Sequence, residues 1–201
     1  MSGSTDVRRI VVGISGASGA IYGIRLVEAL AAYGGIEVHL VMSKGAQATI
    51  SYETDRSPSD IARLAHAVYD ERDLAASIAS GTFLTSAMVV APCSIRSLSA
   101  IANSANDNLL VRAADVHLKE RRTLVLVVRE TPLHLGHLRL MTEVTMSGGI
   151  ILPPVPGFYT LPHTIDQLVD HTIGKVLDSI GLSEHTLFPR WNGPQDTASL
   201  Q

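Results

Sequence analysis

The chain has 201 residues, of which 46% are hydrophobic and 17% charged, and its formal net charge at pH 7 is -3. This composition is typical of a globular protein, and the small negative charge gives no general reason to expect nucleic acid or an anionic membrane as a partner. The single cysteine, Cys93, excludes a framework of intrachain disulfides, and the apolar runs are too short to span a bilayer. We therefore expect a cytoplasmic protein with a single domain over residues 1–201, of which 183–201 form a C-terminal tail.

Short apolar runs typical of strands alternate along the chain with longer segments typical of helices. We expect strands at residues 10–14, 37–42, 87–91, 123–128 and 149–152. We expect helices at residues 20–33, 45–51, 59–67, 94–102, 109–121, 135–146 and 165–180. This alternation predicts an α/β fold with a three-layer, Rossmann-like or flavodoxin-like parallel sheet and helices on both faces. Ligands of such sheets bind beyond the carboxyl ends of the strands, so the residues that follow each strand are candidates for chemistry.

The turn after the first predicted strand carries three glycines, Gly13, Gly16 and Gly19, each three residues after the previous one. A turn of this kind directs backbone N–H groups and the positive end of a helix dipole toward one place, which suits a phosphate. The spacing differs from the G-x-G-x-x-G of dinucleotide enzymes and therefore favours a mononucleotide. A tight corner with no ligand is the alternative.

The next predicted strands also end in polar residues. Ser43 follows the second strand and is explained equally by a helix N-cap. After the third strand, Ser94 and Ser97 bring hydroxyl and N–H groups to a helix start, as a second cradle for an anion or a carbonyl group would need. The fourth strand ends in Arg129 and Glu130, where a carboxylate beside a cation can be tuned for proton transfer. A surface ion pair explains that last pair equally well.

Two other patterns suggest chemistry but have simpler explanations. Cys93 has no base beside it in the sequence, which favours a small, partly buried thiol over a nucleophile. His134 and His137 are spaced as two metal ligands on one helix face, but no third ligand with suitable spacing accompanies them. We therefore expect no metal site.

Several charged or polar residues remain without an assignment from their local pattern. Arg112 and Lys119 lie on the helix expected at 109–121, where the spacing of charges is typical of a solvated, salt-bridged face. Glu53 is either a charge on a helix or a catalytic carboxylate. Tyr159 ends the only proline-dense stretch, which can form a stiff pocket wall, and Lys175 is an isolated cation on the last helix.

Five motifs, taken together and in this order, resemble the flavin prenyltransferases of UbiX type. They are GISGASGAIYG at 13–23, APCS at 91–94, RAADV with LKERR at 112–122, VRETP at 128–132 and PGFY at 156–159. The resemblance covers nearly the whole chain, from about residue 10 to residue 191. It implies transfer of a dimethylallyl group from dimethylallyl monophosphate to reduced FMN without a metal ion. The product would be prenylated FMN, with a fourth ring closed between flavin N5 and C6, for use by decarboxylases of UbiD type.

The resemblance also implies roles for individual residues. FMN would be held by Gly16, Ala17, Ser18, Ser43, Ser94, Ile95, Arg96, Ser97 and Arg129. The prenyl donor would be bound by Tyr159, Lys175, Arg112 and Trp191, with Lys119 near its phosphate, and the catalytic residues would be Glu53, Lys119 and Glu130. Lys175 stands where relatives often carry Arg, which keeps the charge but removes bidentate geometry. Relatives of this family form homo-oligomers of twelve subunits, so we expect a dodecamer.

Two other functions are compatible with the same motifs. One is an FMN-dependent decarboxylase of the type that acts on cysteine, which would need oxidised FMN and a motif that clamps the substrate. The other is a non-catalytic FMN carrier, which would not need both Glu53 and Glu130. Because these carboxylates occur together with Lys119, Tyr159 and Lys175, we favour prenyl transfer.

Overall fold

The computed structural model of the chain describes residues 7–191 and 193. Six strands form one parallel sheet in the order β3-β2-β1-β4-β5-β6. These strands are β1 (Arg8–Ile14), β2 (Ile36–Met42), β3 (Ala67–Tyr69), β4 (Ala87–Cys93), β5 (Thr123–Val128) and β6 (Ile150–Ile151). The order reverses between β1 and β4, as in doubly wound folds that bind a ligand at this point. The predicted α/β fold is confirmed.

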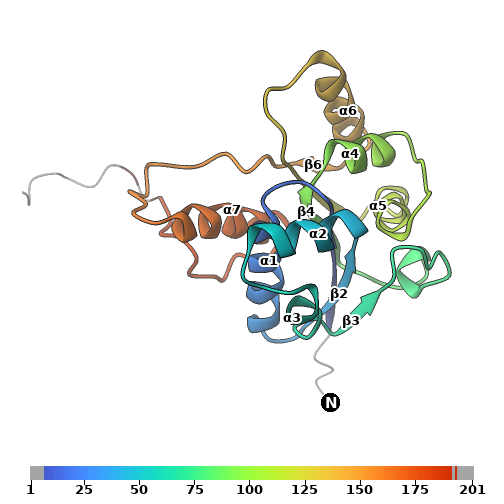
Figure 1. Ribbon diagram of the computed structural model, residues 1–201, viewed down its shortest axis with the longest axis horizontal. Helices are drawn as coiled ribbons and strands as arrows, with labels where there is room; N and C mark the ends of the chain where they lie inside the picture. The colour runs from blue at the N-terminus through green and yellow to red at the C-terminus, as the bar shows by residue number, and fades with distance from the viewer. Residues whose placement is uncertain (1–6, 192, 194–201) are drawn as a thin grey trace, which may run out of the picture.

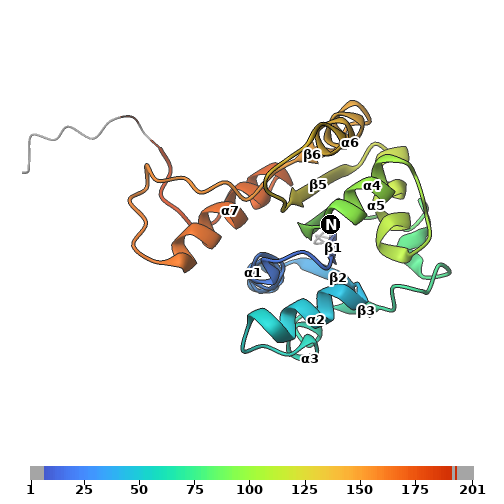
Figure 2. The ribbon, with the colours of Figure 1, turned by 45° about the horizontal axis from the view of Figure 1, so that its top comes forward.

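In the part of the chain that the structure describes, seven helices and one short 3-10 helix connect and follow the strands. They are α1 (Ala20–Ala32), α2 (Lys44–Glu53), α3 (Pro58–Ala62), η1 (Ser77–Ala79), α4 (Ile95–Ala102), α5 (Leu109–Lys119), α6 (Leu135–Met146) and α7 (Ile165–Ser179). Figures 1 and 2 show α1 and α7 side by side on one face of the sheet, and α4 and α5 together on the other. Among the described residues, no helix combines the length and the apolar character that crossing a membrane requires.

The two faces of the sheet bury separate apolar clusters. Along β1, Ile10, Val12 and Ile14 pack toward α1 and α7, whereas Val11 packs toward α4 and α5. This alternation follows from the two-residue period of side chains along a strand. Because both faces are covered, the strands read as continuous apolar runs rather than as an alternating pattern.

The structure differs from the predicted elements mainly in one region. The helix expected at 59–67 ends at Ala62, and Ala67 instead begins the strand β3, which was not predicted. Three residues are too few to show a strand period, so the sequence signal for β3 is weak. The start of α3 is well marked, because Ser57 and Asp60 form a capping box and Pro58 is the first helical residue.

Residues 152–164, between β6 and α7, contain no helix or strand, and we call this segment the arm. In Figure 1 the arm leaves the sheet and loops out to the left beside α7. Its large apolar side chains Val155, Phe158 and Leu161 are mostly exposed. The arm therefore adds little to the core of the chain that carries it.

Candidate active site

The carboxyl ends of β1 and β4 are tied together by one buried side chain. The Ser15 hydroxyl donates to the Pro92 carbonyl oxygen at 2.8 Å and accepts a hydrogen bond from the Ser94 N–H at 2.7 Å. Ser15 is 1% exposed, so both of these hydrogen bonds are shielded from water. They hold Ser94, the N-cap of α4, at the point where the strand order reverses.

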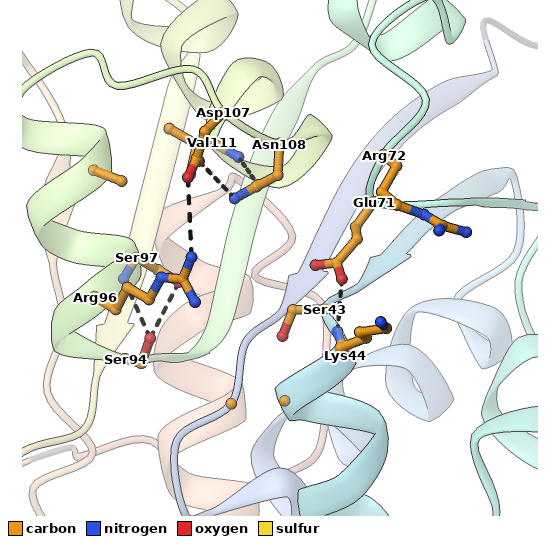
Figure 3. A pocket seen from close by; sticks show the side chains of 13 residues that line it. Ser43, Lys44, Glu71, Arg72, Ser94, Arg96, Ser97, Asp107, Asn108 and Val111 are labelled. Atoms are coloured by element: carbon orange, nitrogen blue, oxygen red, sulfur yellow. Dashed lines mark hydrogen bonds and ion pairs between the residues drawn. The ribbon is translucent and has the colours of Figure 1, made fainter.

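A cavity of about 510 Å³ opens at this edge of the sheet. Figure 3 shows the start of α4 on one side of it and the start of α2 on the other. Its lining comprises Gly16, Ser43, Lys44, Gly45, Glu71, Arg72, Ser94, Arg96, Ser97, Ala100, Asp107, Asn108 and Val111. The volume lies within the range of small-molecule sites. Three helix N-termini, three hydroxyl groups and three cations are suited to a phosphorylated ligand.

The glycine turn forms the floor of this cavity through a close approach of two backbones. A Cβ atom on Gly16 would lie 2.9 Å from the Cα of Gly45, and a Cβ on Gly45 would lie 3.1 Å from the Cα of Gly16. A side chain at either position would therefore separate the turn after β1 from the start of α2. Ala17, the next residue, is buried.

The N-terminus of α1 binds a carboxylate of the chain itself. Glu53, the last residue of α2, accepts hydrogen bonds on Oε2 from the N–H of Gly19 at 2.8 Å and of Ala20 at 3.1 Å. Desolvation raises the pKa of Glu53, but the hydrogen bonds from Ser18, Gly19 and Ala20 and the charge of Arg129 together lower it below its usual value. Glu53 is therefore a fixed carboxylate anion at neutral pH.

Arg129 and Glu130 follow β5 at the same edge of the sheet. The side chain of Arg129 lies over Gly19, since its Cγ would be 4.0 Å from a Cβ at that position, and its charge also acts on Tyr22. Glu130 is exposed, and its Oε1 accepts a hydrogen bond from the Thr131 N–H at 3.0 Å. The structure thus brings Glu53, Ser18 and Arg129 together. Glu130 directly follows Arg129 in the chain.

A second group of predicted residues lies on the arm and α7. The Tyr159 hydroxyl is 2.9 Å from Nε2 of His171, and the rings of Tyr159 and Trp191 meet edge to face at 5.8 Å. Lys175 follows His171 by one helical turn and is exposed. Tyr159, Lys175 and Trp191 are therefore brought together, but none of them lines the cavity at the start of α4.

Arg112 and Lys119 lie elsewhere. Arg112 donates to Asp115 and to the Ala79 carbonyl oxygen, both at 3.2 Å, which is the ion-paired helix face that the charge spacing indicates. Lys119 ends α5 and pairs with Glu120. Since α5 starts at the cavity and runs about 16 Å back along the sheet, Lys119 lies near the opposite edge, beside the start of β5. One subunit does not bring Lys119 to its own cavity.

Several residues of the cavity wall were not predicted. The Glu71 carboxylate accepts a hydrogen bond from the Lys44 N–H at 3.0 Å, and the Glu71 carbonyl oxygen accepts one from Leu109 N–H at 2.7 Å. Arg72, Asp107 and Asn108 come from loops without a recognisable motif; only Asn108, as the N-cap of α5, had a local signal. Within the described part of the chain, no three His, Cys, Asp or Glu side chains are grouped as a metal ion would need.

Comparisons with known proteins show the family to which this chain is similar. The profile of the Flavoprotein family matches residues 1–176. The flavin prenyltransferase UbiX of Thauera aromatica is 59% identical over 188 residues, which are 94% of this chain and 96% of that protein. The crystal structure of AnUbiX in complex with FMN and dimethylallyl pyrophosphate is similar with a TM-score of 0.90 and 49% identity, covering 94% of this chain and 99% of that one.

Two further structures show how far the similarity extends. A dodecameric FMN-dependent UbiX-like decarboxylase from Escherichia coli O157:H7 has a TM-score of 0.90 and 46% identity, covering 92% of this chain and all of that one. The FMN-dependent cysteine decarboxylase TvaF has a TM-score of 0.60, covering 72% of this chain and 88% of that one, with 15% identity. This last likeness concerns the fold alone.

Proposed function

The chain belongs to the Flavoprotein family and, within it, to the flavin prenyltransferases of UbiX type, and from this we propose how its residues carry out prenyl transfer. The protein is a flavin prenyltransferase that uses FMN. We propose that the acceptor is reduced FMN and that the donor is dimethylallyl monophosphate. Bound FMN supplies the nucleophilic ring atoms, and the chain supplies positioning, charge and proton acceptors.

The residues at the carboxyl edge of the sheet fit FMN. We assign the FMN site to the cavity and to the predicted residues around it, which are Gly16, Ala17, Ser18, Ser43, Ser94, Ile95, Arg96, Ser97 and Arg129. The two glycines support this assignment. Because Gly16 and Gly45 have no side chains, their backbone lines the cavity directly, beside Ser43 and Ser94. Hydroxyl and N–H groups at the starts of α2 and α4 are suitable donors to a phosphate.

The carboxylates supply two different functions. Cleavage of an allylic C–O bond builds positive charge on the prenyl group and negative charge on the phosphate. Glu53, whose pKa is lowered, is an anion that stabilises the positive charge. Glu130 is exposed at the same edge, and we assign it the proton that ring closure releases.

The positions of the donor-binding residues, away from the cavity of their own chain, support the proposal of a homo-oligomer. Tyr159, Lys175 and Trp191 lie outside the cavity, and Lys119 lies near the opposite edge of the sheet. We propose that a neighbouring copy completes each site with these groups, in a dodecamer like that of the E. coli relative. We further propose that the protein is cytoplasmic, that residues 1–201 are one domain, and that a UbiD-type decarboxylase receives the product.

One observation carries the proposed role of Glu53: its carboxylate is held at the N-terminus of α1, where the charge of Arg129 acts on it. The test is anaerobic incubation of the purified protein with reduced FMN and dimethylallyl monophosphate, followed by mass spectrometry of the released flavin. A flavin heavier by one five-carbon unit is the expected result.

Parallel reactions with the diphosphate donor, with added chelator and with Glu53→Gln complete this experiment. Loss of product in Glu53→Gln with FMN still bound supports the role of the carboxylate. Unmodified FMN with both donors would contradict prenyl transfer by this protein, and unchanged turnover in Glu53→Gln would remove Glu53 from the mechanism.

A further inference from the structure

No sequence motif singled out His171, the residue of α7 against which the arm packs. The residue is 7% exposed, and its Nε2 lies 2.9 Å from the Tyr159 hydroxyl oxygen. A Cβ atom on Gly157 would lie 2.8 Å from Cε1 of His171, so the arm passes directly against the ring. The position of Tyr159 therefore depends on this histidine.

The other ring nitrogen shows which way this hydrogen bond runs. Nδ1 of His171 is buried and has no hydrogen-bond partner among the described residues. In a neutral imidazole one nitrogen carries the proton and the other accepts. A buried N–H without a partner is rarer than a buried acceptor without one, so the proton belongs on Nε2. His171 then donates to the Tyr159 oxygen, and the Tyr159 O–H remains available to donate to another group.

The surroundings of His171 favour this neutral form. Burial, and after it the charge of Lys175, lower the pKa of His171 below its ordinary value. Lys175 lies one turn further along α7, on the same face of the helix. The Tyr159 hydroxyl and the Lys175 ammonium group thus both lie near one histidine.

We propose that His171 is a positioning residue that orients the Tyr159 hydroxyl to donate, together with Lys175, to the phosphate of the prenyl donor. This inference rests on the proposed function, in which Tyr159 and Lys175 belong to the residues that bind the prenyl donor. His171 thereby supports donor binding through Tyr159, without touching the donor itself. A positioning role also explains why a polar ring is buried where the arm meets α7.

The test is a double-mutant cycle with His171→Leu, Tyr159→Phe and the double variant, made in the full-length protein loaded with FMN. Calorimetry measures the Kd for dimethylallyl monophosphate, and steady-state assays measure KM and kcat. We expect His171→Leu to raise the Kd and KM about tenfold with FMN still bound, as the loss of one hydrogen bond to a charged group predicts. In the Tyr159→Phe background the same change should have less than a twofold effect.

Two further variants separate positioning from packing. His171→Gln retains an N–H donor and should restore most of the affinity, whereas His163→Gln, at an exposed histidine of the arm, should leave Kd and KM unchanged. Equal effects of His171→Leu with and without the Tyr159 hydroxyl would overturn the proposal, as would failure of wild-type protein to bind the donor. Donor binding with the expected coupling but without turnover would leave the role of His171 intact and contradict the proposed function alone.

Discussion

The carboxyl edge of the sheet and the arm differ in how closely they are packed. At the edge, the backbones of Gly16 and Gly45 are in contact, whereas on the arm the side chains of Phe158 and Leu161 are 66% and 75% exposed. At the edge, carboxylates of the chain already cap the starts of α1 and α2, and Ser15 bridges β1 and β4. On the arm, the apolar side chains are exposed, and Tyr159 is held by the buried His171 of α7. The difference supports the proposal that one chain forms the flavin half of the site, while the prenyl half is presented to another copy.

The largest effect should come from Glu130, which we propose accepts a proton and whose exposed side chain contributes little to the fold. Glu130→Gln keeps the shape of the edge and removes the proton acceptor, so kcat should fall about 10²- to 10⁴-fold with FMN affinity unchanged. Single-turnover assays and flavin absorbance measure the two quantities. Wild-type turnover in this variant would contradict the assignment, and Glu143→Gln on α6 is a control at an exposed glutamate outside the site.

The double variant Phe158→Ser, Leu161→Ser tests whether the arm needs a partner. Each exposed side chain that becomes buried between copies contributes about 1.5–3 kcal/mol, so the assembly should weaken at least about a hundredfold. Light scattering should detect smaller particles that bind FMN but no longer transfer the prenyl group. An intact assembly would contradict the role of the arm, and Leu64→Ser, at an exposed leucine after α3, is the matched control.

Acid should destabilise the sheet region through His117. Burial lowers the pKa of this histidine to about 4, and its ring is held by Thr85 and by the Ala113 carbonyl group. The unfolded chain binds a proton below pH 6.5 and the folded chain only near pH 4, so the free energy of unfolding falls as the pH falls through this window. The expected loss is about 3 kcal/mol.

Denaturant titrations at several pH values measure this loss. His117→Gln, which does not titrate, should show a flatter pH dependence even if its stability at pH 7 is lower. The same slope in the variant and the wild type would assign the acid sensitivity to other groups.

The smallest effect concerns Lys175. Lys175→Arg offers two N–H groups to the phosphate in place of one ammonium group, and should lower the KM for the donor about two- to threefold at constant kcat. Steady-state kinetics with dimethylallyl monophosphate measure this change. A higher KM would show that the space beside His171 suits the lysine.

The sequence predicted most of the sheet and the helix-start residues of the cavity because their signals are local. Ser43 and Ser94 follow apolar runs and cap helices, so their own neighbours reveal their positions. The partner of Glu53 was not predictable, because Gly19 lies 34 residues away and no local pattern connects them. His171 was missed for a related reason: on a helix face it reads as an ordinary core histidine until the arm brings Tyr159 to it.

The carboxylate of Glu53 also determines where free anions can bind. A tethered group acts at a high effective concentration, so phosphate or sulfate in solution competes poorly with Glu53 for the N–H groups of Gly19 and Ala20. Removal of the side chain in Glu53→Ala opens this position to small anions in the medium. Added acetate or formate could then take the place of the missing carboxylate, and recovery of turnover with increasing acetate would be chemical rescue of the enzyme.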